Sequence, residues 1–238
     1  MAAGEPLQAI DTDIWLAEGP VVDFYSFPYP TRCVIVRLPG ERLWVWSPIA
    51  LDDDLQAAVD ARGEVAFLVS PNKLHHLSLG QWQRAYPGAE HWGPASTARK
   101  RPDLAFDGEL GDHPPAAWAG AIDQAWFRGS PLLDEVVFCH LPSRTAILAD
   151  LSENFTEAFL RDHWAAWQRP IARLWRITEP WGYAPLELRL SFLDRRTARA
   201  ALAKVLGWQP RRVVMAHGRW QDEEGRAFLE RAFRWLRR

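Results

Sequence analysis

Short runs of apolar residues, separated by turn-forming residues, set the pattern of this chain and predict strands along much of it. The clearest run covers residues 65–69 and ends at Pro71-Asn72, with His75 and His76 just beyond. This pattern predicts a buried strand that delivers two adjacent imidazoles to the start of a helix. Side chains at the carboxyl ends of strands are fixed by the sheet and face a crevice, so they often form sites.

The same periodicities predict the other elements of the chain. Before the clearest strand they are short strands within residues 13–27 around a turn at Gly19-Pro20, a hairpin joining 33–37 to 43–47, and a helix over 51–61. After it comes a helix over 75–86 with Leu77, Trp82 and Ala85 facing inward. The middle of the chain follows with a strand at 89–93, a helix over 96–101, a strand at 122–127 and a hairpin joining 135–140 to 145–149. The last part has helices broken at Pro170, Pro180 and Pro185, a helix from Asp194 to about residue 206, a strand at 213–216 and a last helix from residue 223.

This order of elements predicts an α/β fold of two mixed sheets with helices outside. No linker or internal repeat interrupts the pattern, so we expect one domain over residues 1–238. A segment rich in tryptophan and arginine, at about residues 156–192, is predicted to be a helical insertion or lid.

Composition narrows the class of protein. The formal net charge of −2 gives no electrostatic argument for nucleic acid or an anionic membrane surface. No apolar run approaches the ~18 residues that a membrane span needs, and no signal peptide is evident. Cys33 and Cys139 lie in strand-like runs, which predicts buried free thiols and a cytoplasmic location. The 14 tryptophans suggest aromatic surface as well as core.

Three predicted strands end in possible metal ligands: His75 and His76 after the first, Asp150 after the hairpin, and His217 after the last. Taken alone, such a histidine is more often a hydrogen-bonded core or loop residue, and Asp150 could cap a helix. The repetition at three strand ends favours a metal site. Imidazole and carboxylate ligands suit zinc, iron or manganese.

These residues lie in stretches that resemble the metallo-β-lactamase superfamily, which includes glyoxalase II and lactonases. The resemblance rests on residues 70–76, the hairpin leading to Asp150, and residues 213–218, and it covers nearly the whole chain. The resemblance is strongest to an uncharacterised branch of this superfamily. That branch has short sequence motifs like residues 71–76, Gly129-Ser130-Pro131, residues 135–138 and residues 216–218. The resemblance implies an αββα sandwich with a metal site on one edge between the two sheets.

The resemblance also implies a degenerate first metal site. The superfamily motif is His-x-His-x-Asp-His, and aligning its last histidine with His76 puts Pro71 and Lys73 in place of the first two histidines. Ser130 stands where the third histidine of that site belongs.

The second metal site is better preserved under this resemblance. It keeps His76 and His217, has His75 in place of the motif aspartate, and retains Asp150, the residue that bridges the two metals elsewhere in the superfamily. One divalent ion is therefore expected, zinc first and iron or manganese as alternatives. Loss of metal altogether is the other outcome.

Hairpin geometry decides which residues neighbour Asp150. Because each strand residue advances the chain by ~3.3 Å, Asp150 lies far from the turn and opposite Asp134 or Glu135. His140 lies at the turn, so we do not assign it to the site. Glu135 is either a solvated carboxylate at the strand edge or a part of the site.

Two functions remain open from the sequence. The first is a hydrolase of a small-molecule substrate with a mononuclear site of His75, His76, Asp150 and His217, in which Asp150 is also the catalytic carboxylate. Lys73, Glu135 and Asn72 would support that site.

The second function is a non-catalytic binding or scaffold protein in which Lys73 replaces the charge of the missing first metal and pairs with Asp150. An iron-dependent oxidase is a third possibility without specific support. No nucleic-acid partner is expected, and the oligomeric state is open. His91, His113 and His163 are interpreted as structural or solvent-exposed.

Overall fold

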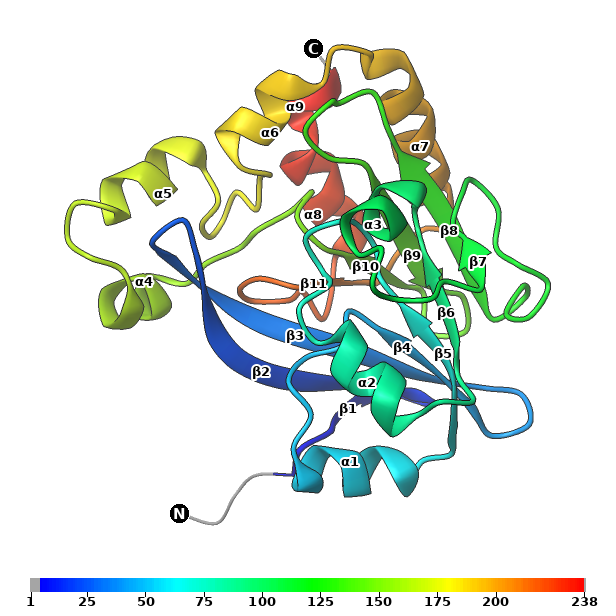
Figure 1. Cartoon of the computed structure of the whole chain (residues 1–238). Helices are drawn as coiled ribbons and strands as arrows, with labels where there is room; N and C mark the ends of the chain where they lie inside the picture. The colour runs from blue at the N-terminus through cyan, green and yellow to red at the C-terminus, as the bar shows by residue number, and fades with distance from the viewer. Residues whose placement is uncertain (1–4, 238) are drawn as a thin grey trace. The chain divides into compact units, whose positions relative to one another are not determined.

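The computed structural model describes residues 5–237 (Figure 1). The chain divides into two compact units. Unit 1 comprises residues 1–20 and 31–110, and unit 2 comprises residues 21–30 and 111–238. Each unit is described by itself below. The expected organisation of residues 1–238 as one domain stays a prediction.

Unit 1 is built on a mixed sheet whose strands, among the described residues, follow the order β1-β2-β3-β4-β5-β6-β7. They are β1 (Gln8–Asp11), β2 (Ile14–Phe24), β3 (Phe27–Leu38), β4 (Arg42–Trp46), β5 (Glu64–Val69), β6 (Glu90–Gly93) and β7 (Gly108–Glu109). β1 pairs with β2, and β3 with β4, antiparallel, whereas β4 to β7 run parallel. The tip of the β2–β3 hairpin belongs to unit 2.

The strands predicted from the hydrophobic pattern are confirmed for the central strands of the unit 1 sheet. β5 matches the clearest predicted strand, and the β3–β4 hairpin turns at Pro39-Gly40 as expected. Helix α1 (Asp53–Asp60) begins where the Asp52 side chain accepts a hydrogen bond of 2.8 Å from the Leu55 backbone nitrogen. α1 and α2 (Leu79–Ala85) pack on β5, and α3 (Ala95–Lys100) packs on β6.

The predicted turn at Gly19-Pro20 is wrong, because β2 runs straight through it. Gly19 is needed for close packing instead: a Cβ atom there would lie 2.3 Å from Thr31 Oγ1 and 2.9 Å from Ile49 Cγ2. The Thr31 hydroxyl also donates a 2.8 Å hydrogen bond to the Pro20 carbonyl. The hairpin turns later, at Tyr25 and Ser26, which both have positive φ.

The helix predicted over residues 75–86 begins later than expected, at Leu79, so His75 and His76 lie in the preceding turns. Trp82 is buried as predicted. Leu77 was expected to face inward and is instead 67% exposed, because it lies in the turn before the helix.

Unit 2 contains a second mixed sheet, with the order β11-β10-β9-β8 among the described residues. The strands are β8 (Ile122–Phe127), β9 (Glu135–His140), β10 (Thr145–Leu148) and β11 (Arg212–Met215). β8–β9 and β9–β10 are antiparallel and β10–β11 is parallel. Thr145 pairs with His140, which confirms the predicted hairpin register and places Asp150 at the opposite end.

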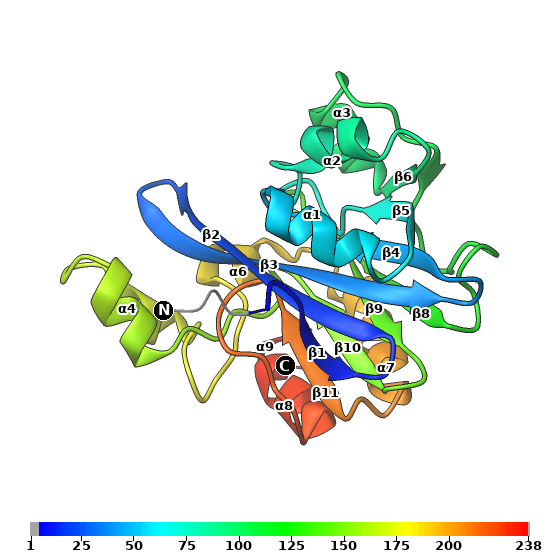
Figure 2. The same ribbon diagram turned by 90° about the horizontal axis from the view of Figure 1, so that it is seen from below.

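Helices pack on this sheet too. Asp194 caps α7 (Arg195–Gly207) by accepting a 2.9 Å hydrogen bond from the Arg196 nitrogen, as predicted. α7 packs on β8, and α8 (Gly225–Ala232) packs on β11 (Figure 2). The predicted last helix is interrupted at Phe233, after which α9 (Arg234–Arg237) begins.

Residues 156–192 form the short helices α4 (Glu157–His163), α5 (Arg169–Trp175) and α6 (Leu186–Ser191). Pro170 and Pro185 lie at the starts of α5 and α6 and not inside them. Proline is tolerated there because the N–H that it lacks would have no acceptor within the helix. A core around Phe155, Leu160 and Trp164 holds this region together. Its role as a lid stays a prediction.

Two composition-based predictions can be compared with the structure. Cys33 and Cys139 are free and buried, as expected. Among the described residues, no helix is long and apolar enough to cross a membrane.

Candidate metal centre

Asp150 directly follows β10 and is held by Glu135 across the hairpin. Glu135 Oε1 accepts a hydrogen bond from the Ala149 nitrogen and Oε2 accepts one from the Asp150 nitrogen, both at 2.8 Å. Glu135 is fully buried, so the alternative of a solvated strand-edge carboxylate is wrong. Hydrogen bonds to a charged acceptor are about twice as strong as neutral ones, so this carboxylate fixes the backbone that carries Asp150.

Asp150 does not cap a helix. The next helix, α4, is capped by Thr156, whose side chain accepts a hydrogen bond from the Phe159 nitrogen. The carboxylate of Asp150 is buried and faces His217 instead, with 3.4 Å between Asp150 Oδ1 and His217 Nε2.

His217 follows β11, and its ring orientation is set by the hairpin tip of unit 2. His217 Nδ1 lies 2.7 Å from the Pro30 carbonyl oxygen, which can only accept, so Nδ1 carries the proton. In the neutral imidazole, Nε2 then presents its lone pair toward Asp150 Oδ1. A histidine that donates one N–H to a carbonyl while its other nitrogen faces an anionic ligand is typical of metal-binding histidines.

A positive charge between its members would make this contact favourable. An imidazole lone pair and a carboxylate oxygen 3.4 Å apart repel each other when both are deprotonated. A second proton on His217 or a bound cation turns the contact into an attraction. The pair is therefore built either as a buried salt bridge or as two ligands of one cation.

The loop after β11 is locked to the loop after β10. The Asn154 nitrogen donates to the His217 carbonyl at 3.1 Å, and the Arg219 nitrogen donates to the Asn154 carbonyl at 2.8 Å. Gly218 lies between them with φ +91°, and a Cβ there would lie 2.3 Å from the Asn154 carbonyl oxygen. Only glycine fits this position, and its fit keeps His217 beside Asp150.

A second buried carboxyl group lies close to this pair. Tyr29 donates a long 3.5 Å hydrogen bond to Glu153 Oε2, and the Tyr29 ring packs on His217 with 5.0 Å between ring centroids. Burial, and then the charges of Asp150 and Glu187, raise the pKa of Glu153. Burial, followed by the Glu153 charge, also raises the pKa of Tyr29. Both groups therefore favour their protonated, neutral forms.

In unit 1, the turn after β5 is shaped by Asn72. The buried Asn72 side chain accepts hydrogen bonds from the Leu74 nitrogen at 2.8 Å and the His75 nitrogen at 3.4 Å. Ser70 Oγ lies within hydrogen-bonding distance of the Asn72 and His75 carbonyl oxygens, at 2.8 and 2.9 Å. Asn72 thus organises the turn that carries His75 and His76, and its predicted support of a metal site stays a prediction.

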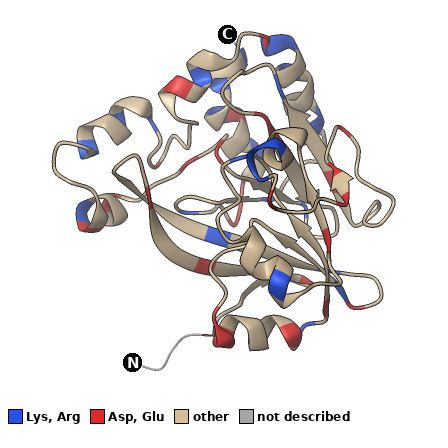
Figure 3. Cartoon of the chain, in the orientation of Figure 1, with Lys and Arg blue, Asp and Glu red and all other residues tan. Residues whose placement is uncertain are grey.

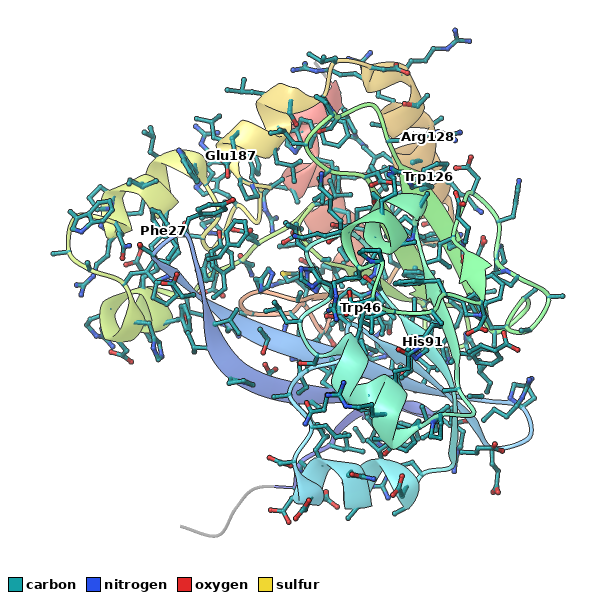
Figure 4. The ribbon with its side chains drawn as sticks, in the orientation of Figure 1. Phe27, Trp46, His91, Trp126, Arg128 and Glu187 are labelled. Carbon is teal, nitrogen blue, oxygen red and sulfur yellow. The ribbon has the colours of Figure 1, made fainter. Side chains whose placement is uncertain are left out.

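His75 is oriented by Ser47, which directly follows β4. His75 Nδ1 lies 2.7 Å from Ser47 Oγ, which leaves Nε2 as the nitrogen that the ring can offer to a metal. The ring also lies beside Trp46, labelled in Figure 4, with 5.9 Å between ring centroids. Ser47 adopts φ +50°, a conformation that few non-glycine residues tolerate.

His76 has a different environment from His75. Arg101 Nη1 donates a 2.8 Å hydrogen bond to the His76 carbonyl and lies 3.4 Å from His76 Nδ1. Burial, and then the positive charges of Lys100 and Arg101, lower the pKa of His76. A cationic neighbour opposes the binding of another cation at the same imidazole, so these contacts do not favour His76 as a ligand.

The histidines that the sequence analysis left out of the metal site lie in other environments. His140 is buried at the β9–β10 turn, where its Nδ1 lies 2.8 Å from the Ser143 hydroxyl. This hydrogen bond agrees with leaving His140 out of the site. His91 is buried on β6, His113 is exposed, and His163 packs on Phe159 at the end of α4. Lys73 is only partly exposed in the turn before His75.

The whole chain is similar to solved metallo-β-lactamases. A DIM-1 metallo-β-lactamase structure aligns at 14% identity over 97% of this chain and 95% of that enzyme, with a TM-score of 0.66. FIM-1 from Pseudomonas aeruginosa, solved in its mono-zinc form, aligns at 12% identity over 97% and 94%, with a TM-score of 0.61. A metallo-β-lactamase from Erythrobacter litoralis aligns at 12% identity over 100% and 98%, with a TM-score of 0.65.

This chain has the metallo-β-lactamase fold. The predicted fold class of two mixed sheets with helices is thereby confirmed. No protein-family model matches the sequence, and no curated protein does so either. At 12–14% identity the similarity concerns the fold alone, so ligands and activity must be argued from the residues of this chain.

Within this metallo-β-lactamase fold, several supporting residues could not be predicted from the motif. Pro30 and Tyr29 reach His217 from a distant part of the sequence, and Glu153 and Asn154 lie in the loop that follows Asp150. The His217-Gly218 dipeptide was the one available signal, since a glycine after a strand-end histidine indicates a close approach of backbone. Ser130, which the resemblance places where a histidine is expected, pairs with Ser191 at 2.6 Å between hydroxyls.

Proposed function

We propose that this protein is a metal-dependent hydrolase that binds one divalent ion through His75, Asp150 and His217. These side chains offer two imidazole nitrogens and one carboxylate oxygen, a set that suits zinc first and iron or manganese as alternatives. Three protein ligands are also what catalytic zinc sites use, because one position then stays open for water or substrate.

The contact between His217 and Asp150 carries this proposal. The Nδ1 proton is committed to the Pro30 carbonyl, so Nε2 and the Asp150 oxygen face each other as two acceptors at 3.4 Å. A divalent cation satisfies both at once. The second nitrogen of His75 is similarly directed by the 2.7 Å contact of its Nδ1 with Ser47.

The residues around the ligands have separate roles in this proposal. A bound divalent ion would supply a Lewis acid that polarises a carbonyl or phosphoryl oxygen of a small-molecule substrate. Asp150 orients the attacking water and accepts its proton. Glu135 holds the Asp150 backbone in place, and Asn154 with Gly218 holds His217. The neutral Glu153 and Tyr29 avoid a surplus of negative charge next to Asp150.

The proposed ligand set omits one residue of the predicted set of four ligands. His76 was predicted as a ligand because it fills the last histidine position of the motif. Its contact with Arg101 gives it another role, to hold the turn against α3. His75, Asp150 and His217 are kept from the predicted set.

The experiment is elemental analysis of protein purified without a polyhistidine tag, combined with a hydrolysis screen against esters, thioesters, lactones and phosphoesters. We expect close to one equivalent of metal, lost in His217→Ala together with any hydrolytic activity. A folded protein without metal and without zinc affinity would contradict the proposal. That result would favour the alternative of a non-catalytic protein with Lys73 paired to Asp150.

A further inference from the structure

Two arginines of unit 2 lie over the ring of one buried tyrosine, Tyr183. Arg176 directly follows α5 and Arg189 lies on α6, and Figure 3 shows basic positions on both helices. The guanidinium carbon lies 5.0 Å from the centre of the Tyr183 ring in Arg189 and 5.9 Å from it in Arg176. Arg176 also lies over the Trp181 ring, at 4.5 Å. We call Arg176 and Arg189 the arginine pair.

Hydrogen bonds hold the arginine pair around this ring. The Tyr183 nitrogen donates to the Arg176 carbonyl at 3.0 Å. Arg189 Nε donates to the Ala184 carbonyl at 2.9 Å, and Arg189 Nη2 donates to the Trp175 carbonyl at 2.8 Å. Stacking on an aromatic ring uses the face of a guanidinium group and leaves its N–H edge available to an acceptor. The pair is therefore oriented before any ligand binds.

The positive charges of the arginine pair are not matched by a bound carboxylate. Among the residues that the structure describes, the Arg176 side chain makes no hydrogen bond or ion pair, and the Arg189 side chain bonds only to backbone carbonyls. Arg173 on α5 differs, because it is ion-paired with Glu157 at 2.6 Å. Burial lowers the pKa of Arg189, and the positive charge of Arg176 adds to that lowering. An anion bound to both groups would relieve this repulsion.

Tyr183 ties the arginine pair to the loop that follows Asp150. The Glu153 nitrogen donates a hydrogen bond of 3.2 Å to the Tyr183 carbonyl. Glu153 lies three positions after Asp150 in the sequence, and three residues span at most about 11 Å. Glu187, labelled in Figure 4, lies close enough to both Glu153 and Arg189 for its charge to act on each. The arginine pair is therefore within reach of a small molecule whose reacting group lies at Asp150.

The chemistry of the arginine pair indicates a small oxyanion as its ligand. Planar guanidinium groups bind carboxylate and phosphate oxygens through short hydrogen bonds between charged partners. Nucleic acid would need a longer basic surface, whereas the neighbouring Arg161 and Arg173 are already paired with Asp162 and Glu157. Two guanidinium groups beside one ring suit a single carboxylate or phosphate group.

We propose that the arginine pair binds a carboxylate or phosphate group of the substrate, at a distance from the bond that is hydrolysed. This inference rests on the proposed hydrolase function and names the class of its substrate, a small anionic molecule. Arg176 and Arg189 determine specificity in this proposal and take no part in bond cleavage. By holding the anionic group, they position the rest of the substrate toward Asp150.

Calorimetric titration of the full-length protein with inorganic phosphate tests the arginine pair without any reaction. We expect binding that weakens with added salt, and an affinity about tenfold lower in Arg176→Gln. The Arg176 side chain is exposed, so this variant should keep its melting temperature. Arg173→Gln is the matched control, because Arg173 lies on α5 but is paired with Glu157, and it should bind phosphate like the wild type. Absence of phosphate binding, or equal losses in the two variants, would overturn the proposal.

Two esters that differ by one carboxylate, phenyl acetate and 3-acetoxybenzoate, test the link to the substrate. We expect the wild type to prefer 3-acetoxybenzoate by about tenfold in kcat/KM, Arg176→Gln to lose most of this preference, and Arg173→Gln to keep it. Equal rates for both esters in the wild type would overturn this inference and leave the hydrolase function standing. Phosphate binding that depends on Arg176 in a protein without metal or hydrolysis would keep the anion site and contradict the hydrolase function. If neither ester is hydrolysed, the phosphate titration decides.

Discussion

The turn after β5 and the loops after β10 and β11 all carry candidate ligands, but they are held in different ways. In unit 1, Asn72 and Ser70 bond to backbone within a few residues, and Ser47 and Arg101 add one longer-range contact each to His75 and His76. The charges beside His76 are the positive ones of Lys100 and Arg101. In unit 2, the supporting bonds come from distant parts of the chain, the groups are buried, and the neighbouring charges are carboxylates.

This difference indicates where a cation is needed. A buried group of carboxyls beside an imidazole lone pair is stabilised by a positive charge, whereas the turn that carries His76 already has one in Arg101. Long-range support also means that single substitutions in unit 2 should cost more free energy than comparable ones in unit 1.

The largest effect on folding is expected at Glu135. Glu135→Ala leaves two buried backbone N–H groups without their acceptor, so the free energy of unfolding should fall by about 3 kcal/mol. Urea denaturation measures this loss. Glu135→Gln keeps the volume and one acceptor oxygen and should lose about half as much. A loss below about 1 kcal/mol for Glu135→Ala would mean that Glu135 does not hold the Asp150 loop.

Gly218 should give the next largest effect. Gly218→Ala combines a positive φ with a clash against the Asn154 carbonyl, so we expect a loss of about 2 kcal/mol and a weaker metal affinity. Gly111, where a Cβ would meet nothing within 4 Å, is the matched control in the same unit. Gly111→Ala should change the free energy of unfolding by less than about 0.5 kcal/mol. Equal effects at the two glycines would contradict the packing argument.

A substitution at Asn72 tests how much the local hydrogen bonds stabilise the turn in unit 1. Asn72→Ala removes the side-chain hydrogen bonds to the Leu74 and His75 nitrogens, for a loss of about 1 kcal/mol. Thermal unfolding of Asn72→Ala and Glu135→Ala under the same conditions compares the two losses of stability directly. If Asn72→Ala cost more than Glu135→Ala, the contrast between local and long-range support would be wrong.

The smallest effect should depend on pH. Because the folded-state pKa of Glu153 is raised above its ordinary value of 4.5, stability falls as pH rises from 4.5 toward the folded pKa. Glu153→Gln removes this loss, so its melting temperature should exceed that of wild type above pH 4.5 and converge with it below.

The opposite sign is expected at Glu157, whose pKa is lowered by its hydrogen bonds with Arg173. Its stabilising contribution is present above pH 4.5 and is lost as pH falls through the folded pKa, so Glu157→Gln should be slightly less stable than wild type at neutral pH. The same sign for both variants would contradict the assignment of Glu153 as a buried neutral carboxyl.

Local periodicity was enough to predict much of the fold and part of the site. β8 and the β9–β10 hairpin match their predicted strands closely, and hairpin register alone placed Glu135 beside Asp150 and His140 away from it. The predictions were wrong where tertiary contacts override local signals. Gly19-Pro20 resembles a turn, but Thr31 and Ile49 fill the space where a side chain would be.

The rest of the site depends on contacts that no local pattern encodes. The Pro30 carbonyl that orients His217 lies 187 residues earlier in the sequence, and Tyr29 and Glu153 are 124 residues apart. The motif alignment favoured His76 because it fills the last histidine position. The position of Arg101, 25 residues later, could not be read from that motif.

The central claim is that one divalent ion binds His75, Asp150 and His217, and adjacent histidines offer its sharpest test. Zinc titration of metal-free protein should give one site in wild type, an affinity reduced by more than about 100-fold in His75→Ala, and a nearly unchanged affinity in His76→Ala. A loss in His76→Ala with retention in His75→Ala, or no zinc binding by the wild-type protein, would contradict the account.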